Sequence, residues 1–592
     1  MARDFSAVLD RLPDDRSPAP GTRRIGPWQV RLDAADGALV SRPELDLHVL
    51  VKGCLYGATP DDLLDAYLHG GRDFPRNIEG HYAALILDGP AGRVLAVADR
   101  VGSQAMYAAH TPQHVLVSTR PDWAPFRERP LSLEGVSAYL TKGSLLGGLT
   151  LRQGVGVLRR ACVHDLAGSH VCTHEYWPLT FTGPQAGASM ADLQAEFAHL
   201  IRGAMTRRIQ ASGGRAYLSL SGGYDSRGLL SVLTSLGADV RTFSYALDAR
   251  APGSDAQVAH RLAAQYGTRH TVLGAYHGSV LGNVRRNVAW GGGGAPLCDE
   301  ADAWADFAAL NPSDVFVGDH AFDINSHPLS LHADQLLRQK VPPSFGILAW
   351  LRPTLPPTTY AAMQGAWEQT LARVLAQAGA GPDRNLTGYP LEIALMLDVN
   401  VGHSLLPWRD RFAGHTAHVH LPYLDGALLD FTRRLPLEVL ARKAMFRRVL
   451  HTLDPHLMRV PLARSLGYVP DWTAELIAQR AEIWGHVQAT SSPLDDVIPP
   501  DVIHALLLEL APTPRSVQLR GAARQTLGRL RRTPLGLRVF GPAPIRKTVD
   551  AATFLRRVLT VRAVVADGAG SVVQDAEGTR ARPAGLTWAV GD

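Results

Sequence analysis

Short apolar segments separated by turns make up most of the first 180 residues. Six of them are rich in β-branched or aromatic residues and end at Gly, Pro or Asp, and we expect each to form a strand: 28–34, 47–54, 81–89, 93–100, 105–110 and 114–120. Many short strands broken by turns are typical of a sandwich. A turn-rich linker follows over 180–189, and Ser189 is expected to cap the next helix.

The hydrophobic period changes after residue 190. Apolar residues recur three and four positions apart between Leu193 and Met205, which predicts an amphipathic helix. Strands are then predicted within 215–223, 240–247, 269–275 and 314–320, with helices between the first three. Strands that alternate with helices predict a parallel sheet with crossover connections. The glycine-rich segment 290–296 is interpreted as a lid or a crossover beside this sheet, and most of the later chain is predicted to be helical.

Length and composition limit the class of protein. The chain has 592 residues, which is too many for one core, and we divide it into domains at 1–182, 190–480 and 481–592. No apolar run reaches the roughly 18 residues that span a bilayer, and the N-terminus has no apolar signal region. The four cysteines form no CxxC pair, which argues against zinc and disulfides and favours a reducing cytoplasm. The oligomeric state stays open.

The net charge of the chain is small, but the charged residues are unevenly distributed along the sequence. A net charge of +5 gives no reason to expect nucleic acid as a partner. Between Arg515 and Arg562, however, twelve basic residues face the single acid Asp550. This segment is either a solvated helical face or a docking surface for an acidic peptide or partner.

The run Ser221-Gly222-Gly223-Tyr224-Asp225-Ser226 between a predicted strand and a predicted helix has the pattern of a phosphate-binding loop. Glycines permit close backbone approach, and helix N-termini attract anions. The motif lacks the lysine of a Walker A loop, and it is not a dinucleotide fingerprint. An aspartate in such a loop suits Mg²⁺, which prefers carboxylate and phosphate oxygens together. The candidate nucleotide-binding residues are Ser219, Ser221, Gly222, Gly223, Asp225, Ser226, Ser244 and Gly318.

The loop "LSGGYDS" resembles the pyrophosphate loop of ATP pyrophosphatases, and specifically that of the asparagine synthetase B family. Further stretches are similar to the same family: "IEGHYAALILD", "VLAVADRVGSQAMYAA", "LTKGSLLGGLTLRQGVGVLRRACVHDL", "HVHLPYLDGALLDF" and "KAMFRRVL". The likeness covers roughly residues 30–475. It implies an α+β, Ntn-hydrolase-like (glutaminase-type) sandwich followed by an α/β PP-loop synthetase domain with helical additions. It also implies ATP and Mg²⁺, an acyl-adenylate, and release of AMP and pyrophosphate.

The sequence departs from the family at the expected glutaminase nucleophile. Members that hydrolyse glutamine have a cysteine at position 2, where this chain has Ala2, and the first cysteine is Cys54 within a predicted strand. We therefore expect an inactive glutaminase-like domain and an amine that comes from elsewhere. Members without the cysteine include β-lactam synthetase, carbapenam synthetase and lasso-peptide macrolactam cyclases, in which the amine is already part of the substrate.

Three more departures affect the implied catalytic residues. The family's second metal motif is represented by Gly318 to Asp323, so that Asp323 or Asp319 is expected to join Asp225 as a metal ligand, with Asp323 favoured. The alternative is that these acids only shape a turn. His418 stands where β-lactam synthetases have a glutamate, and it is a candidate general base, although a structural histidine is the more common case.

The family's phosphate-contacting lysine is missing. Arg464 is the first candidate for that charge and Lys443 the second.

Three functions remain open on these grounds. The first is an ATP-dependent macrolactam synthetase of the lasso-cyclase type, with a precursor peptide and a leader protease as partners. The second is the same adenylation chemistry on a small carboxylate and amine, as in β-lactam formation. The third is a nucleotide-binding scaffold without activity.

Overall fold

The first 175 residues contain two antiparallel sheets of six strands each. The computed structural model describes residues 4–12, 18–35, 38–183, 187–321, 348, 350–380, 386–512 and 549–566. One sheet has the order β10 (Gly156–Val157), β8 (Tyr107–Thr111), β9 (His114–Ser118), β1 (Phe5–Arg11), β3 (Trp28–Ala34), β2 (Arg23–Ile25). The other has the order β12 (Cys172–Glu175), β11 (Cys162–Asp165), β7 (Arg93–Ala98), β6 (Gly80–Asp88), β5 (Leu47–Leu55), β4 (Leu39–Arg42).

The position of strand β6 in the fold explains why its sequence is almost entirely apolar and does not alternate between apolar and polar residues. Ala83, Leu85 and Leu87 face the core between the two sheets. Tyr82, Ala84 and Ile86 point to the opposite face and join the large core of the rest of the chain. Because side chains alternate along a strand, a strand covered on both faces needs apolar residues at every position. The six strands predicted in this part of the chain are confirmed, whereas β1, β2, β4, β10, β11 and β12 were not predicted.

The second half contains a five-stranded parallel sheet with the order β15 (Arg269–Gly274), β14 (Asp239–Ala246), β13 (Arg215–Ser219), β16 (Asp314–Phe316), β17 (His418–His420). All neighbouring strands in it run parallel. The predicted helix after the linker is α4 (Met190–Ala211), and Ser189 caps it through a capping box with Asp192. The chain is thus a mixed α/β protein, as the sequence pattern predicts.

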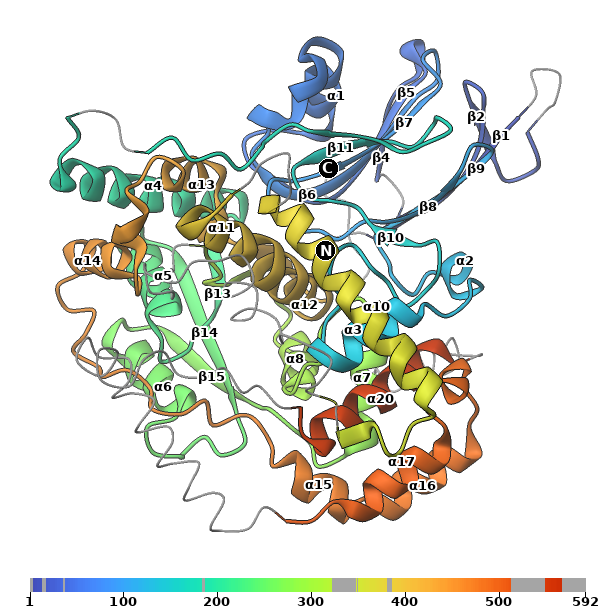
Figure 1. Ribbon diagram of the computed structural model, residues 1–592. Coiled ribbons are helices and arrows are strands. Elements are labelled where there is room, and N and C mark those ends of the chain that lie inside the picture. Colours follow the sequence, from blue (N-terminus) through green and yellow to red (C-terminus); the bar gives the residue numbers. More distant parts are fainter. Residues whose placement is uncertain are drawn as a thin grey trace.

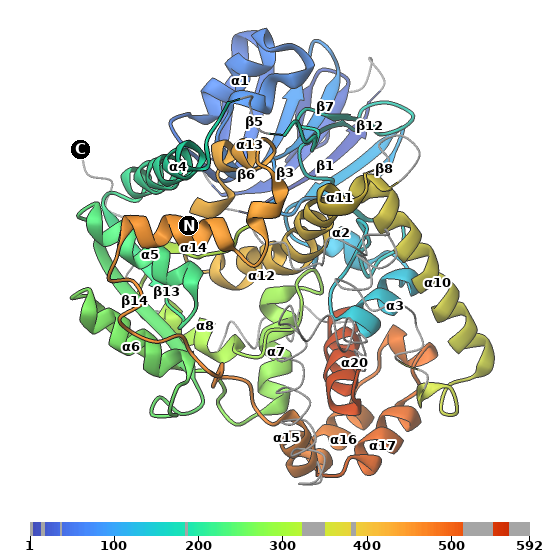
Figure 2. The ribbon, with the colours of Figure 1, turned by 60° about the vertical axis from the view of Figure 1, so that its left-hand side comes forward.

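Helices α5 (Tyr224–Ser235) and α6 (Asp255–Gln265) connect the first three parallel strands, and α7 (Val280–Gly291) and α8 (Ala301–Ala308) follow them. After β16 come α10 (Pro357–Leu375) and a helical segment over 388–413 that includes α11 (Gly388–Leu395) and α12 (Leu406–Trp408). Figures 1 and 2 both place α11 and α12 between the N-terminal sheets and the parallel sheet. Within the described residues, no helix is long and apolar enough to cross a membrane.

The described part of the C-terminal extension is helical and packs into the molecule. It comprises α16 (Arg480–Ala489), α17 (Pro500–Glu509) and α20 (Ala551–Val565), and α20 lies beside α7 and the N-terminal helix α3 (Leu133–Lys142) (Figure 2). Three arginines of the basic segment lie on α20, and the structure corrects both interpretations for them. Arg556 pairs with Asp299, Arg557 donates to backbone carbonyls at the end of α3, and Arg562 pairs with Asp495. The other nine basic residues, within 515–547, lie outside the described residues.

The glycine-rich segment 290–296 is not a lid. Gly291 to Gly293 are buried, and a Cβ on Gly293 would lie 2.8 Å from side-chain atoms of both Leu151 and Val564. The glycines therefore allow three parts of the chain to meet closely.

Candidate functional site

The loop Ser221-Gly222-Gly223 lies where the strand order of the parallel sheet reverses. From β13 the chain proceeds outward to β14 and β15, and then returns to the other side of β13 with β16. In open α/β sheets, ligands bind at the carboxyl ends of the strands at such a switch point. A cavity of about 270 Å³ lies at this position.

Predicted binding residues meet in this cavity. Its lining includes six of the eight candidates, namely Ser219, Ser221, Asp225, Ser226, Ser244 and Gly318. The other two, Gly222 and Gly223, complete the loop between β13 and α5. Residues up to about 100 positions apart in sequence therefore lie around one volume that opens at the end of the sheet.

Hydrogen bonds within the loop fix its shape. The Ser226 hydroxyl accepts from the Ser221 backbone N–H at 3.0 Å, and the Gly222 N–H donates to the Asp255 carboxylate at 2.9 Å. A Cβ on Gly222 would lie only 2.3 Å from that of Ala463, so a larger residue does not fit there. Helix α5 begins at Tyr224, and the preceding residue Gly223 provides no side-chain cap, so the N-terminus of the helix can attract an anion.

Asp225 is held by two cationic or potentially cationic neighbours. The Lys443 ammonium donates to both carboxylate oxygens at 2.8 Å, and His320 Nε2 lies 3.3 Å from Oδ1. Burial raises the pKa of Asp225, but His320 and Lys443 outweigh it and hold the pKa at about 2. Asp225 is therefore a carboxylate at neutral pH.

Backbone strain brings Lys443 to this position. Arg442 and Lys443 have φ values of 52° and 58°, a region that non-glycine residues rarely adopt. Lys443 is the residue before α14 (Ala444–Leu453), and the unusual turn directs its side chain toward Asp225. Strain of this kind costs roughly 1–3 kcal/mol per residue and occurs preferentially at functional sites.

Asp319 pairs with a residue that the sequence did not indicate. Arg409 donates to its two oxygens at 2.7 and 3.3 Å, and the guanidinium stacks on Trp408 at 4.0 Å from the ring centre. Both Arg409 and Trp408 line the cavity. Nη1 of Arg409 is buried and has no hydrogen-bond partner among the described residues. Only its "WRDR" context could have marked this arginine, because its partner is 90 residues away.

The carboxylates fit Mg²⁺ only together with phosphate oxygens. Asp225, Asp255 and Asp319 line the cavity, but the first pairs with Lys443 and the third with Arg409. Within the described ranges, no three His, Cys, Asp or Glu side chains are grouped to hold a metal by themselves. Mg²⁺ commonly uses one or two carboxylates and completes its shell with phosphates and water. Asp225 suits that pattern, whereas the favoured second ligand Asp323 lies outside the described residues.

The three predicted catalytic residues, Lys443, Arg464 and His418, lie at different places relative to the cavity. Lys443 contacts the loop carboxylate, whereas Arg464, the first candidate, is exposed beside Gly253 and is absent from the described cavity lining. His418 pairs with Asp314 at the amino end of β16, so it lies at the opposite end of the strands from the loop. The structure therefore corrects the general-base assignment of His418 with respect to this cavity.

Cys54 contacts His418 and not the nucleotide cavity. Its Sγ lies 3.5 Å from His418 Nδ1, and burial raises the thiol pKa to about 11. A thiol with a raised pKa is a poor nucleophile at neutral pH. The Cys54 thiol is therefore poorly suited to act as a nucleophile. Ala2 lies outside the described residues.

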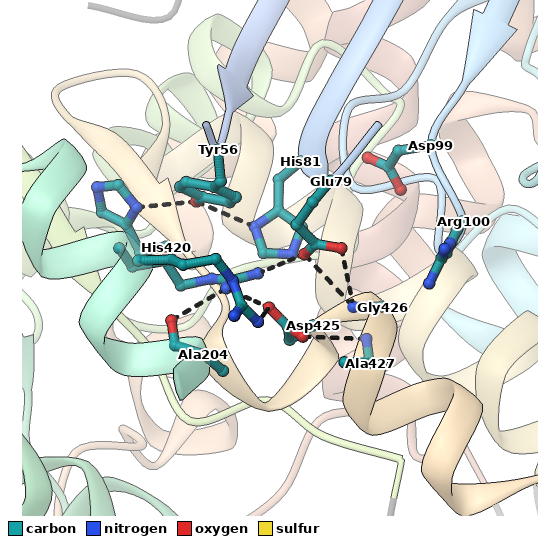
Figure 3. A network of polar contacts seen from close by, with 12 residues as sticks. Tyr56, Glu79, His81, Asp99, Arg100, Ala204, His420, Asp425, Gly426 and Ala427 are labelled. Atoms are coloured by element: carbon teal, nitrogen blue, oxygen red, sulfur yellow. Dashed lines mark hydrogen bonds and ion pairs between the residues drawn. The ribbon is translucent and has the colours of Figure 1, made fainter. Parts of the chain in front are cut away.

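A buried polar network joins the N-terminal sheets to the synthetase half (Figure 3). The Arg208 guanidinium binds Asp425 at 2.7 Å and Glu79 at 3.0 Å, and it lies 4.3 Å from the ring centre of Tyr56. The Tyr56 hydroxyl contacts His420 Nδ1 at 2.9 Å. Burying charged groups is costly, and their mutual pairing offsets that cost, so the loss of one member leaves the others uncompensated.

The same network borders the nucleotide loop. Tyr423 lies between His420 and Asp425 in sequence, and its hydroxyl donates to the backbone carbonyl of Asp225 at 3.2 Å. The N-terminal sheets therefore hold the segment that supports the first turn of α5.

Comparison with known proteins identifies one region. Residues 196–305 match the family model described as asparagine synthase, and this region includes the loop and the strands β13 to β15. The match supports an ATP-dependent ligase that forms amide bonds in general. No curated protein matches the chain significantly. A glutamine phosphoribosylpyrophosphate amidotransferase from B. subtilis, solved with ADP and GMP, aligns over 46% of this chain and 85% of its own at 9% identity. Its TM-score is 0.20, too low to support any argument. The chain thus contains an asparagine synthase-like region, residues 196–305, that contributes most of the lining of the cavity at the switch point of the parallel sheet.

Proposed function

We propose that the protein activates a carboxylate with ATP as an acyl-adenylate and then forms an amide. The observation that supports this best is the cavity at the switch point of the sheet, where the loop serines, Asp225 and Gly318 meet. Backbone N–H groups and hydroxyls suit the pyrophosphate that leaves when the bond between the α- and β-phosphates is broken.

The chemistry proceeds in two displacements. An oxygen of the substrate carboxylate attacks the α-phosphorus, the bond to the β-phosphate oxygen breaks, and pyrophosphate leaves. A neutral amine then attacks the acyl carbon, the bond to AMP breaks, and the amine proton is lost. Charge builds up on phosphate oxygens in the first step, where Lys443 and the Arg409 guanidinium, which lines the cavity, offer positive charge.

Mg²⁺ fits this proposal with Asp225 as its protein ligand. When bound, the ion would neutralise phosphate charge and act as a Lewis acid. Lys443 would then exchange its contact with Asp225 for one with phosphate.

The amine is proposed to belong to the substrate itself, so that the product is a macrolactam of the lasso-peptide type. Two features support this proposal: position 2 is alanine, and the thiol of Cys54 has a raised pKa. A precursor peptide and a leader protease are the partners proposed with it. Holding both groups on one molecule supplies the effective concentration that free ammonia would lack.

A second candidate is amide formation on a small molecule, as in β-lactam synthesis. It is favoured by the internal contacts of Arg556, Arg557 and Arg562, because these arginines are not available to dock a peptide.

ATP–pyrophosphate exchange tests the adenylation step. Exchange is expected with candidate linear peptides or amino acids, and AMP, not ADP, should accumulate on turnover. Asp225→Asn should reduce exchange by at least about 100-fold, while Asp239→Asn, an exposed acid at the far end of β14, should leave it unchanged.

The reaction products then distinguish macrolactam formation from amide formation on a small molecule. A product 18 mass units lighter than a linear peptide supports macrolactam formation. Formation of ADP, or equal exchange in the two variants, would refute the proposed adenylation at this loop.

A further inference from the structure

Residues 457–468 form a segment, here called the strap, that lies beside the loop between β13 and α5. Two of its residues, Leu466 and Tyr468, line the cavity at the switch point of the parallel sheet. The backbone N–H of Leu247, directly after β14, donates to the carbonyl of Gly467 at 3.0 Å. The strap is therefore bonded to the carboxyl end of β14 and forms part of the cavity wall.

Arg227 of α5 holds the beginning of the strap. The residue is 0% exposed. Its Nη1 donates to the carbonyls of Leu457, at 2.9 Å, and Val460, and its Nη2 donates to the carbonyl of Pro461 at 3.3 Å. No carboxylate among the described residues pairs with this guanidinium. Backbone carbonyls therefore take the place of a counter-ion, and three of them belong to the strap.

The same guanidinium also binds the loop. Nη2 of Arg227 donates to the carbonyl of Gly222 at 3.2 Å, and the N–H of Ala463 in the strap donates to this oxygen at 3.4 Å. The N–H of Gly222 is held from the other side by Asp255 at 2.9 Å. The Gly222 carbonyl is thus fixed only by the strap and by the arginine that holds the strap.

The direction of this carbonyl determines what the loop presents to an anion. A trans peptide is planar, so its C=O and N–H groups point in opposite directions. Because the Gly222 carbonyl faces Arg227, the N–H of Gly223 points away from it, toward the hydroxyl of Ser221 at 3.3 Å. Two adjacent glycines would permit this peptide to turn over. The turned peptide would direct a carbonyl oxygen, which repels phosphate, toward the side of Ser221 that lines the cavity.

These contacts require the geometry of an arginine. Burial lowers the pKa of Arg227, but a guanidinium stays protonated in proteins. Its hydrogen bonds are therefore charge-assisted and roughly twice as strong as neutral ones. Nη1 serves the strap alone, whereas Nη2 serves both the strap and the loop. A lysine has its three donors on one nitrogen atom and cannot occupy both positions.

We propose that Arg227 is a positioning residue for phosphate binding. It joins the strap to the loop and keeps the Gly222–Gly223 peptide in the orientation that presents an N–H group, and not a carbonyl oxygen, to the terminal phosphates of ATP. Arg227 itself touches no substrate in this role. The identity of these phosphates as the departing pyrophosphate rests on the proposed function, whereas the positioning of the loop does not.

Calorimetric titrations of the full chain with pyrophosphate and with AMP, both in the presence of Mg²⁺, test this role. AMP lacks the two phosphates that the loop is proposed to hold. Arg227→Met keeps an apolar stem but removes the donors. It should weaken pyrophosphate binding by at least about tenfold, which corresponds to about 1.4 kcal/mol, and change AMP binding by less than about twofold. Arg227→Lys should show the same selective loss, and it provides the same comparison if Arg227→Met does not fold.

Arg557→Met is the matched control. Arg557 also donates to three backbone carbonyls, those of Leu140, Thr141 and Lys142, and none of these residues is part of the described lining of the cavity. Its loss removes a comparable set of hydrogen bonds from another part of the molecule. Arg557→Met should therefore bind pyrophosphate as tightly as the wild type does.

The outcomes distinguish this role from the proposed function. Equal losses of pyrophosphate and AMP affinity, an equal loss of pyrophosphate affinity in Arg557→Met, or unchanged pyrophosphate binding in the Arg227 variants would overturn the positioning role and leave the proposed function intact. The absence of pyrophosphate binding by the wild type would also overturn it. Pyrophosphate binding that depends on Arg227, in a chain without any ATP–pyrophosphate exchange, would keep the positioning role and refute the proposed adenylation.

Discussion

Arg207 and Arg208 allow a direct measurement of what burial does to an ion pair. Both donate to the same oxygen of Asp425 at 2.7 Å. The Arg208 side chain is 0% exposed and that of Arg207 is 39% exposed. The two arginines are adjacent in α4 and share a partner and a distance, but they differ in burial and in the further contacts of Arg208 with Glu79 and Tyr56.

Replacement by methionine should therefore have very different effects. Arg208→Met keeps the apolar stem but leaves the buried Asp425 and the partly buried Glu79 with less compensation, and breaking a buried pair costs about 3–5 kcal/mol. Arg207→Met removes a partly exposed contact that solvent screens, and the cost should be below about 1 kcal/mol. A typical domain has a stability of about 5–15 kcal/mol, so the first change is severe.

Urea denaturation followed by tryptophan fluorescence measures the two costs, with the midpoint compared at equal slope. Nucleotide binding provides a second measurement, because the network supports Tyr423 and thereby the loop. We expect weaker ATP binding for Arg208→Met and unchanged binding for Arg207→Met. Equal midpoints for the two variants, or a cost below about 1 kcal/mol for Arg208→Met, would refute the argument from burial.

Three further predictions concern the nucleotide cavity and its surroundings. Gly222→Ala should lower stability by about 1–3 kcal/mol because its Cβ would lie 2.3 Å from that of Ala463, whereas Gly223→Ala, with its nearest atom at 3.4 Å, should have little effect on the melting temperature. Burial lowers the pKa of His270 to about 4, so the stability that its neutral form contributes is present above pH 6.5 and is lost as the pH falls toward 4. The loss should amount to about 3 kcal/mol and disappear in His270→Gln; a variant with the same pH dependence of unfolding would contradict this. Tyr423→Phe removes a hydrogen bond to the first turn of α5 and should weaken ATP binding by up to about tenfold in a calorimetric titration, while unchanged affinity would exclude this role.

Much of the fold could be predicted from the sequence because it depends on local patterns. The continuous apolar run of β6, the capping residue Ser189 and the alternation of strands and helices after residue 190 each reflect neighbours within one element. The loop was also visible, since its glycines and serines are consecutive. Strands β1, β2, β4, β10, β11, β12 and β17 were missed: all of them except β1 have two to four residues, too few to show a period.

The partners of the site residues were decided only by the tertiary structure. Asp319 meets Arg409, Asp225 meets Lys443, and Arg556 on α20 meets Asp299, pairs separated by 90 to 257 residues. His418 was placed by analogy of motif, yet the register of β17 against β16 carries it to the far end of the sheet. Hydrophobic periodicity determines which residues are buried within an element, but strand order and register determine which charged side chains share a cavity.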